Sequence, residues 1–153
     1  MAVHKIDGVD GVVNYPRKFV TLWSDGAAIA KGDVVQISTS TTYGIGLTVT
    51  QADHQDGQYV VGIAMEAAGT TAIPIRVQVA GFNDIAVANV IIDIFDMVGV
   101  DDSDHGEMNT VGGTAGATVA FSTQVQAFAL CIRAYTAGNS DGAIMIYDHG
   151  FYG

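Results

Sequence analysis

The sequence predicts an all-β protein, a small β-barrel or β-tulip-like sandwich of short antiparallel strands. Several short segments alternate apolar and polar residues, which is typical of strands with one buried face. The 153 residues are 49% hydrophobic and include 19 Gly but only 2 Pro, and Val, Ile and Thr are frequent. This composition favours strands joined by tight turns over long helices. A chain of this length is expected to form one domain.

The clearest strands lie within residues 60–82, which predict a hairpin with a small-residue turn at 67–72. Its alternating apolar residues are expected to share a buried face: Val61, Ile63, Met65, Ile73, Ile75, Val77 and Val79. The intervening positions are expected to face solvent: Glu66, Pro74, Arg76 and Gln78. Period-two patterning predicts one dry face and one wet face for this hairpin.

Residues 1–18 open the chain and contain Pro16 together with half of the basic residues, Lys5, Arg17 and Lys18. Pro16 limits regular pairing, so we interpret the segment as an extended N-terminal arm, with an edge strand as the alternative. An arm with this charge is suited to docking on an acidic or apolar neighbour.

The next elements are short. Residues 19–23 predict a strand followed by a turn at 24–26, and Trp23 is either a core residue or an interface anchor. Lys31-Gly32-Asp33 predicts a turn that starts a strand, with Gly32 in a backbone conformation that other residues avoid. Residues 44–50 predict another strand, and residues 85–98 predict one or two apolar strands, with a short helix as the alternative.

The last third of the chain resembles the hairpin. Residues 128–133 align with residues 61–66, which places Phe128, Leu130 and Ile132 at the apolar positions. After a turn two residues longer, Ile144 and Ile146 align with Ile75 and Val77, and Gly150-Phe151 with Gly81-Phe82. We therefore expect a single domain, residues 19–153, with an internal repeat of 29–82 and 87–151. Upstream of the two hairpins, residues 29–31 align with residues 87–89. The Asp-rich loop 101–116 is expected to be an insertion without core residues. The alternative to an internal repeat is that alternating strands resemble one another by chance.

Charge and composition narrow the possible functions. A net charge of −10 argues against nucleic-acid binding, and the low charged fraction of 14% favours an oligomer or a bound partner. The single cysteine, Cys131, is expected to be a core residue. No signal peptide or membrane span is expected, so the chain is expected to be made in the cytoplasm without membrane contact.

No catalytic, cofactor or metal site is predicted. Asp101, Asp102, Asp104 and Glu107 offer oxygen ligands, but the EF-hand spacing fails, so a solvated acidic loop is favoured over a cation site. His4, His54, His105 and His149 have no metal-ligand spacing. Because no nucleophile elbow, phosphate loop or dinucleotide motif occurs, an enzyme has no positive support.

Part of the chain resembles a known family. Residues 30–35 (AKGDVV), 50–53 (TQAD), 60–64 (VVGIA) and 77–81 (VQVAG) are similar, in order and spacing, to the small capsid decoration proteins of tailed bacteriophages. The resemblance covers about a third of the chain. It implies a β-barrel or β-tulip domain that binds the outer surface of a phage capsid as a homotrimer and stabilises the head.

On this resemblance the partners are the major capsid protein and the chain itself, and the location is the virion surface. The candidate capsid contacts are Lys5, Tyr15, Arg17 and Lys18. The candidate subunit contacts are Trp23, Glu66, Arg76, Phe151 and Tyr152. An alternative function is a receptor- or carbohydrate-binding module of a fibre, with Trp23, Tyr43 or Tyr152 as stacking platforms. A β-barrel enzyme is the third possibility.

Overall fold

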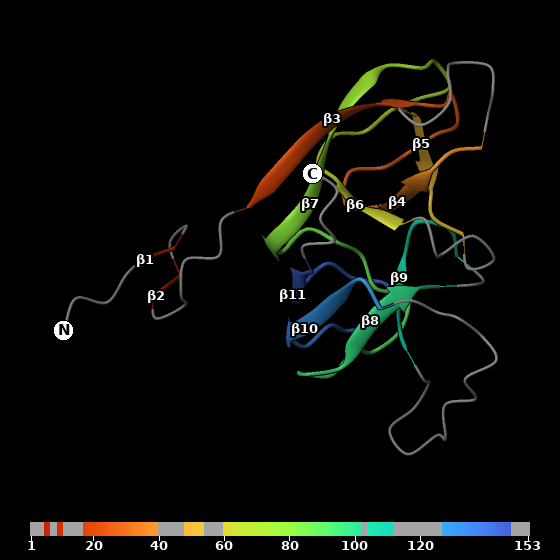
Figure 1. The fold of residues 1–153 in the computed structure, drawn as a ribbon. Coiled ribbons are helices and arrows are strands. Elements are labelled where there is room, and N and C mark those ends of the chain that lie inside the picture. Colours follow the sequence, from red (N-terminus) through yellow and green to blue (C-terminus); the bar gives the residue numbers. More distant parts are fainter. Residues whose placement is uncertain are drawn as a thin grey trace.

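The computed structural model describes residues 5–6, 9–10, 17–39, 48–53, 60–101, 104–111 and 127–147, and all regular elements there are strands (Figure 1). The strands are β1 Lys5–Ile6, β2 Val9–Asp10, β3 Lys18–Ser24, β4 Val34–Ile37, β5 Thr48–Gln51, β6 Val60–Ala64, β7 Pro74–Asn83, β8 Met97–Val100, β9 Met108–Thr110, β10 Ala129–Arg133 and β11 Ala143–Ile146. The all-β prediction is confirmed. In the described ranges no helix is long and apolar enough to cross a membrane.

Five strands close into a barrel in the order β3, β5, β4, β6 and β7, because β7 also pairs with β3. Four of these pairings are antiparallel, but β3 and β5 run parallel, with Trp23 opposite Thr48. Strand directions cannot alternate all the way round a ring with an odd number of strands. The predicted barrel is confirmed, and its closure requires this exception to the antiparallel prediction.

Strand β7 is the longest and connects the barrel to the rest of the molecule. Ile75, Val77 and Val79 point into the barrel core, as predicted, but the prediction is wrong for Ile73, which precedes the strand and is exposed. The prediction that Gln78 faces solvent is wrong, because Gln78 is fully buried. Its amide donates to the carbonyl oxygens of Ala80 and Phe82 at 3.1 and 2.8 Å, so internal hydrogen bonds replace water.

Strand β6 is buried on both sides. Val35 pairs with Gly62 and Gln36 pairs with Val60, so Val61 is an extra residue in the ladder. A bulge of this kind shifts the side-chain alternation by one position. Val61 therefore packs in the barrel core while Ile63 packs in the second cluster, and the prediction that Val61, Ile63 and Met65 share one face is wrong.

A second unit begins at the end of β7, where β7 pairs with β11. From β11 the order of neighbouring strands in the sheet is β10, β8 and β9. A parallel bridge between Ala88 and Met108 links β9 to the segment after β7. The expected strands at 85–98 are wrong in extent, since this segment has only single bridges and a turn before β8 begins at Met97. The expectation that loop 101–116 lacks core residues is also wrong, because Met108 of β9 is fully buried.

The two units repeat the same backbone hydrogen bonds. Ile29 exchanges two bonds with Ala68, and Ile92 exchanges two with Tyr135. The Gly32 amide donates to Ala64, and the Phe95 amide donates to Cys131. Each turn is also closed by an aspartate three residues after its start.

In both turns a carboxylate accepts a backbone N–H: Asp33 from Ala30 at 2.7 Å, and Asp96 from Asp93 at 3.0 Å. Residues 29–35 therefore correspond to residues 92–98, and the alignment of 29–31 with 87–89 is wrong. The boundaries 29–82 and 87–151 stay a prediction.

The register of the second hairpin also differs from its expected alignment. Ala64 pairs with Val77, and Cys131 pairs with Ile144. Ile144 thus corresponds to Val77 rather than Ile75, and the two turns have equal length. Phe128 is buried as predicted, but Leu130 and Ile132 are only half-buried, whereas Ala129 and Cys131 are fully buried, so the predicted buried face is wrong for Leu130 and Ile132.

Each unit has its own core. The barrel core contains Leu22, Ile29, Val35, Val49, Val61, Ala64, Ala68, Ile75, Val77 and Val79. The second core is built mainly from Ile92, Val98, Val100, Met108, Phe128, Cys131, Tyr135, Ile144 and Ile146. Cys131 is a free, buried thiol, as predicted. Val34 and Ile63 of the barrel wall join the second core, so the two units are packed against each other.

Candidate interaction surfaces

The outer face of β3 and the adjoining part of β7 form one exposed surface, here called the β3 face: Phe19, Thr21 and Trp23 of β3 with Pro74 and Arg76 of β7. Burial alternates along β3, so Phe19 and Trp23 point out of the barrel, and they are 40% and 50% exposed. Trp23 is opposite Pro74 on β7, and its core alternative is excluded. An exposed tryptophan beside other apolar residues is typical of an interaction site.

Arginine side chains stack on aromatic rings on or beside the β3 face, with the Glu66 carboxylate beside Arg76. The Arg76 guanidinium lies 5.3 Å from the centroid of the Phe19 ring, and the Arg17 guanidinium lies 5.2 Å from that of Phe82. Arginine stacked on an aromatic ring keeps its charge while its planar group is held in place. The face therefore combines apolar area with fixed positive charge.

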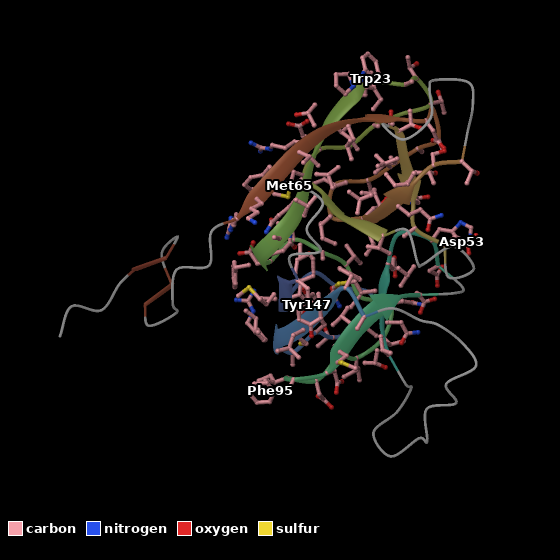
Figure 2. All side chains as sticks on the ribbon, in the orientation of Figure 1. Trp23, Asp53, Met65, Phe95 and Tyr147 are labelled. Atoms are coloured by element: carbon pink, nitrogen blue, oxygen red, sulfur yellow. The ribbon has the colours of Figure 1, made fainter. Side chains whose placement is uncertain are left out.

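A second exposed surface, here called the turn surface, precedes β8 and consists of Ile91, Asp93, Ile94, Phe95, Asp96 and Met97. Phe95 is 77% exposed and has a φ of +74°, the one positive φ at a non-glycine residue in the described ranges. Bulky residues rarely adopt this conformation, and such strain is concentrated at functional positions. Figure 2 shows the Phe95 ring projecting away from the second unit, at the end of the molecule opposite Trp23.

A group of carboxylates lies where the two units meet. The Asp33 carboxylate accepts hydrogen bonds from the Gln51 amide and the Ala30 N–H, both at 2.7 Å, and Gly106 packs against it. Burial raises the pKa of Asp33 above its ordinary value of 3.8. The pKa of Glu107 is also raised, by burial and by the nearby charges of Asp104, Asp101 and Asp33.

These groups do not form a metal centre in the ranges that the structure describes, where no three His, Cys, Asp or Glu side chains converge. His105 lies 3.7 Å from the Asp53 carboxylate at an exposed position. The side chain of Asp101, one of the expected calcium ligands, is buried and accepts bonds from the Asp104 N–H and the Asn109 amide.

The predicted contact residues are only partly brought together. Lys18 belongs to β3 rather than to a separate arm, and the Arg17 stack on Phe82 attaches that residue to the barrel as well. Trp23 and Arg76 share the β3 face, and Glu66 accepts the Arg76 N–H at 3.1 Å. The Lys5 side chain lies outside the described part of the structure. The same holds for all of Tyr15, Tyr43, Phe151 and Tyr152.

The turn surface was not predicted from the sequence, because its apolar residues were interpreted as strand. A signal was present in Asp93 and Asp96, whose spacing matches that of Ala30 and Asp33 around the KGD turn. Aspartate accepts local N–H bonds and so favours turns. The sequence pattern alone could not show that Phe95 stands where Gly32 stands in the other unit.

No protein-family model matches this sequence, and no curated protein matches it either. Among solved structures, the chain is similar to the crystal structure of the head fiber gp8.5 N base in bacteriophage phi29, with a TM-score of 0.57 and 12% sequence identity. The similarity covers 87% of this chain and 96% of the other. The chain therefore has a fold that is also found in the base of a phage head fiber.

Proposed function

We propose that this chain is a non-enzymatic structural protein of a bacteriophage virion, which binds the outside of the head as a homotrimer and stabilises it. The observation that carries the proposal is the fold similarity to the phi29 head fiber base over 87% of this chain. The resemblance of residues 30–35 and 60–81 to capsid decoration proteins supports the same class. The partner on this proposal is the major capsid protein.

The exposed apolar surfaces agree with a role in assembly. A protein that binds a capsid needs contact area rather than a catalytic cleft, and several contacts made at once give high avidity. Residues 1–18, with Lys5, Tyr15, Arg17 and Lys18, remain the proposed contact with the capsid.

The test uses heads that lack the protein, mixed with the full chain or with a variant lacking residues 1–16. The truncation stops before Arg17 because Arg17 and Lys18 belong to the barrel. Co-sedimentation should show the full chain bound at a fixed number of copies per head, and binding by the truncated chain should be lost. The full chain should also raise the temperature at which heads release their contents.

A control variant, Lys31→Ala, removes an exposed basic residue from the barrel turn and should bind heads like the full chain. If the truncated chain decorates heads normally, the proposed arm contact is wrong. If the full chain never binds heads, the proposed function is wrong.

The half-exposed Trp23 favours a second candidate, a carbohydrate- or receptor-binding module of a phage fibre. Glycan-array binding that is lost in Trp23→Ala, together with no binding to heads, would support this candidate instead.

A further inference from the structure

We propose that copies of this chain associate head to tail, with the turn surface of one copy docked on the β3 face of the next. This inference deepens the homotrimer of the proposed function, and it rests on that function only for the size of the ring. The two surfaces and their places in the molecule come from the structure.

The first observation is that the barrel turn is covered within the chain. Gly32 is buried, and a Cβ at this position would overlap the carbonyl oxygen of Ile85 and approach the Val87 side chain. The segment that leaves β7 and starts the second unit therefore lies directly over the barrel turn. In this way the second unit covers the first.

The corresponding turn of the second unit is open. Phe95 takes the place of Gly32, with the same hydrogen bond to the opposite strand, yet it is 77% exposed. Nothing in the described part of the chain covers it. Units that stack in series leave the last one with an open face, which a further unit can cover. Another copy of the chain provides such a unit.

The internal repeat also indicates where the next copy would dock. Phe82 pairs with Met145 in the second unit as Phe19 pairs with Gln78 in the barrel, so the end of β7 corresponds to β3. The segment that covers Gly32 follows the end of β7. The counterparts of Ile85 and Val87 in the barrel are Leu22 and Ser24 of β3, which are buried, so the exposed residue at this end of β3 is Trp23, which lies between them.

Charge supports the same pairing. The turn surface carries Asp93 and Asp96, while Arg17, Lys18 and Arg76 lie on or beside the β3 face and outnumber its neighbouring carboxylate, Glu66. These are three of only six basic residues in a chain with sixteen acidic ones. Contact between unlike surfaces brings acid to base, whereas contact between two turn surfaces or two β3 faces would bring like charges together.

The polarity of the contact sets the kind of assembly. Figure 2 places Trp23 and Phe95 at opposite ends of the molecule, so one copy can use both surfaces at once. A contact between unlike surfaces is heterologous, and it gives a ring when the rotation between copies closes. We therefore expect a cyclic oligomer rather than a two-fold dimer.

Sedimentation velocity of the full chain without heads tests the proposal. Wild type should sediment as a closed oligomer, and Phe95→Gly and Trp23→Thr should each sediment as monomers. Glycine suits a positive φ and threonine suits an exposed strand position, so both variants should keep the wild-type circular dichroism spectrum. An equimolar mixture should form a one-to-one dimer, because each partner keeps one intact surface that fits the other.

Charge reversal gives a second test. Asp93→Arg and Arg76→Glu should each weaken assembly, and the double variant should restore it, because the exchanged charges meet again across the contact. Asp93 takes part in the turn through its backbone, whose N–H donates to the Asp96 carboxylate and whose carbonyl oxygen accepts the Asp96 N–H, so its side chain can be changed.

The proposal fails if wild type is monomeric, if either apolar variant stays fully assembled, or if the mixture forms no dimer. Assembly that is lost only in Phe95→Gly or only in Trp23→Thr would indicate a contact between like surfaces and would also overturn it. Head binding by a monomer would sustain the proposed function alone. Assembly without head binding would sustain only the head-to-tail contact.

Discussion

Single residues show how the two units fill equivalent space differently. In the barrel, Ala68 and Ile75 are a small and a large core residue, whereas in the second unit the corresponding positions hold Tyr135 and Gly142. A Cβ on Gly142 would overlap the Tyr135 ring. The exchange of sizes keeps both cores filled, which close packing requires.

Tyr135→Phe should stabilise the protein. The Tyr135 hydroxyl is buried without a hydrogen-bond partner, and burial raises the pKa of this hydroxyl well above its ordinary value. Removing an unsatisfied buried hydroxyl should raise the free energy of unfolding by about 1 kcal/mol. Denaturant unfolding measures the change. A loss of stability would mean that a buried water satisfies the hydroxyl.

The stability of the protein should depend on pH through Asp33. Because burial raises the folded-state pKa of Asp33, its protonated form is favoured by folding, and the stabilisation is complete below the ordinary value of 3.8. The free energy of unfolding contributed by this group should fall as pH rises through the raised pKa. Thermal unfolding over a pH series should show a shallower dependence in Asp33→Asn, whose amide oxygen can still accept both hydrogen bonds. Identical pH profiles would exclude this role.

At the scale of elements, the strands owe their positions to contacts that local patterning does not encode. The bulge at Val61 moves the side chains of β6 between two cores, and the positive φ of Gly81 lies where β7 leaves the barrel to pair with β11. The sequence correctly predicted the outward positions of Pro74 and Arg76. It could not predict that Gln78 is covered, because the groups that satisfy its side chain, the carbonyl oxygens of Ala80 and Phe82 and the Asn83 amide, are brought to it by the folded backbone of β7.

Gly62→Ala should disrupt the pairing of β6 with β7. A Cβ on Gly62 would overlap the backbone carbonyl of Gln78, and backbone cannot move aside as a side chain can. We expect a loss of about 3 kcal/mol or more. The control is Gly69→Ala, where a Cβ would meet nothing within 4 Å, and its stability should change by at most about 1 kcal/mol. Equal stability of the two variants in urea unfolding would contradict the proposed close approach.

At the scale of the whole molecule, the two units share β7 and part of their cores. β7 pairs with β3 and β6 in the barrel and with β11 in the second unit. The Asn83 amide donates to the Gln78 side chain at 3.1 Å, which links the end of the strand to its middle. Elements that share a strand and a core are expected to unfold together.

Unfolding should therefore be a single transition at protein concentrations where the chain is monomeric. Trp23 fluorescence reports on the barrel and far-ultraviolet circular dichroism reports on all strands, so the two should give the same midpoint. Gly142→Ala, which disturbs only the second core, should lower both midpoints equally. Separate midpoints would mean that the units are independent domains.

The sequence by itself determined that this protein is built from short strands with tight turns, because two-residue periodicity and turn-forming Gly and Asp are local properties. It also indicated that Cys131 is a core residue and that Gly32 adopts a positive φ, which the structure confirms. These features depend on the chemistry of neighbouring residues alone.

Only the tertiary structure decided which strands pair, which faces are covered and where the exposed surfaces lie. Trp23 is exposed because the outer face of β3 has no strand packed on it in the described chain, and Phe95 is exposed because no described segment covers its turn as residues 85–87 cover that of Gly32. Burial is a property of contacts between residues distant in sequence. The same apolar pattern therefore predicts a strand wherever it occurs but cannot say which of its residues remain open to a partner.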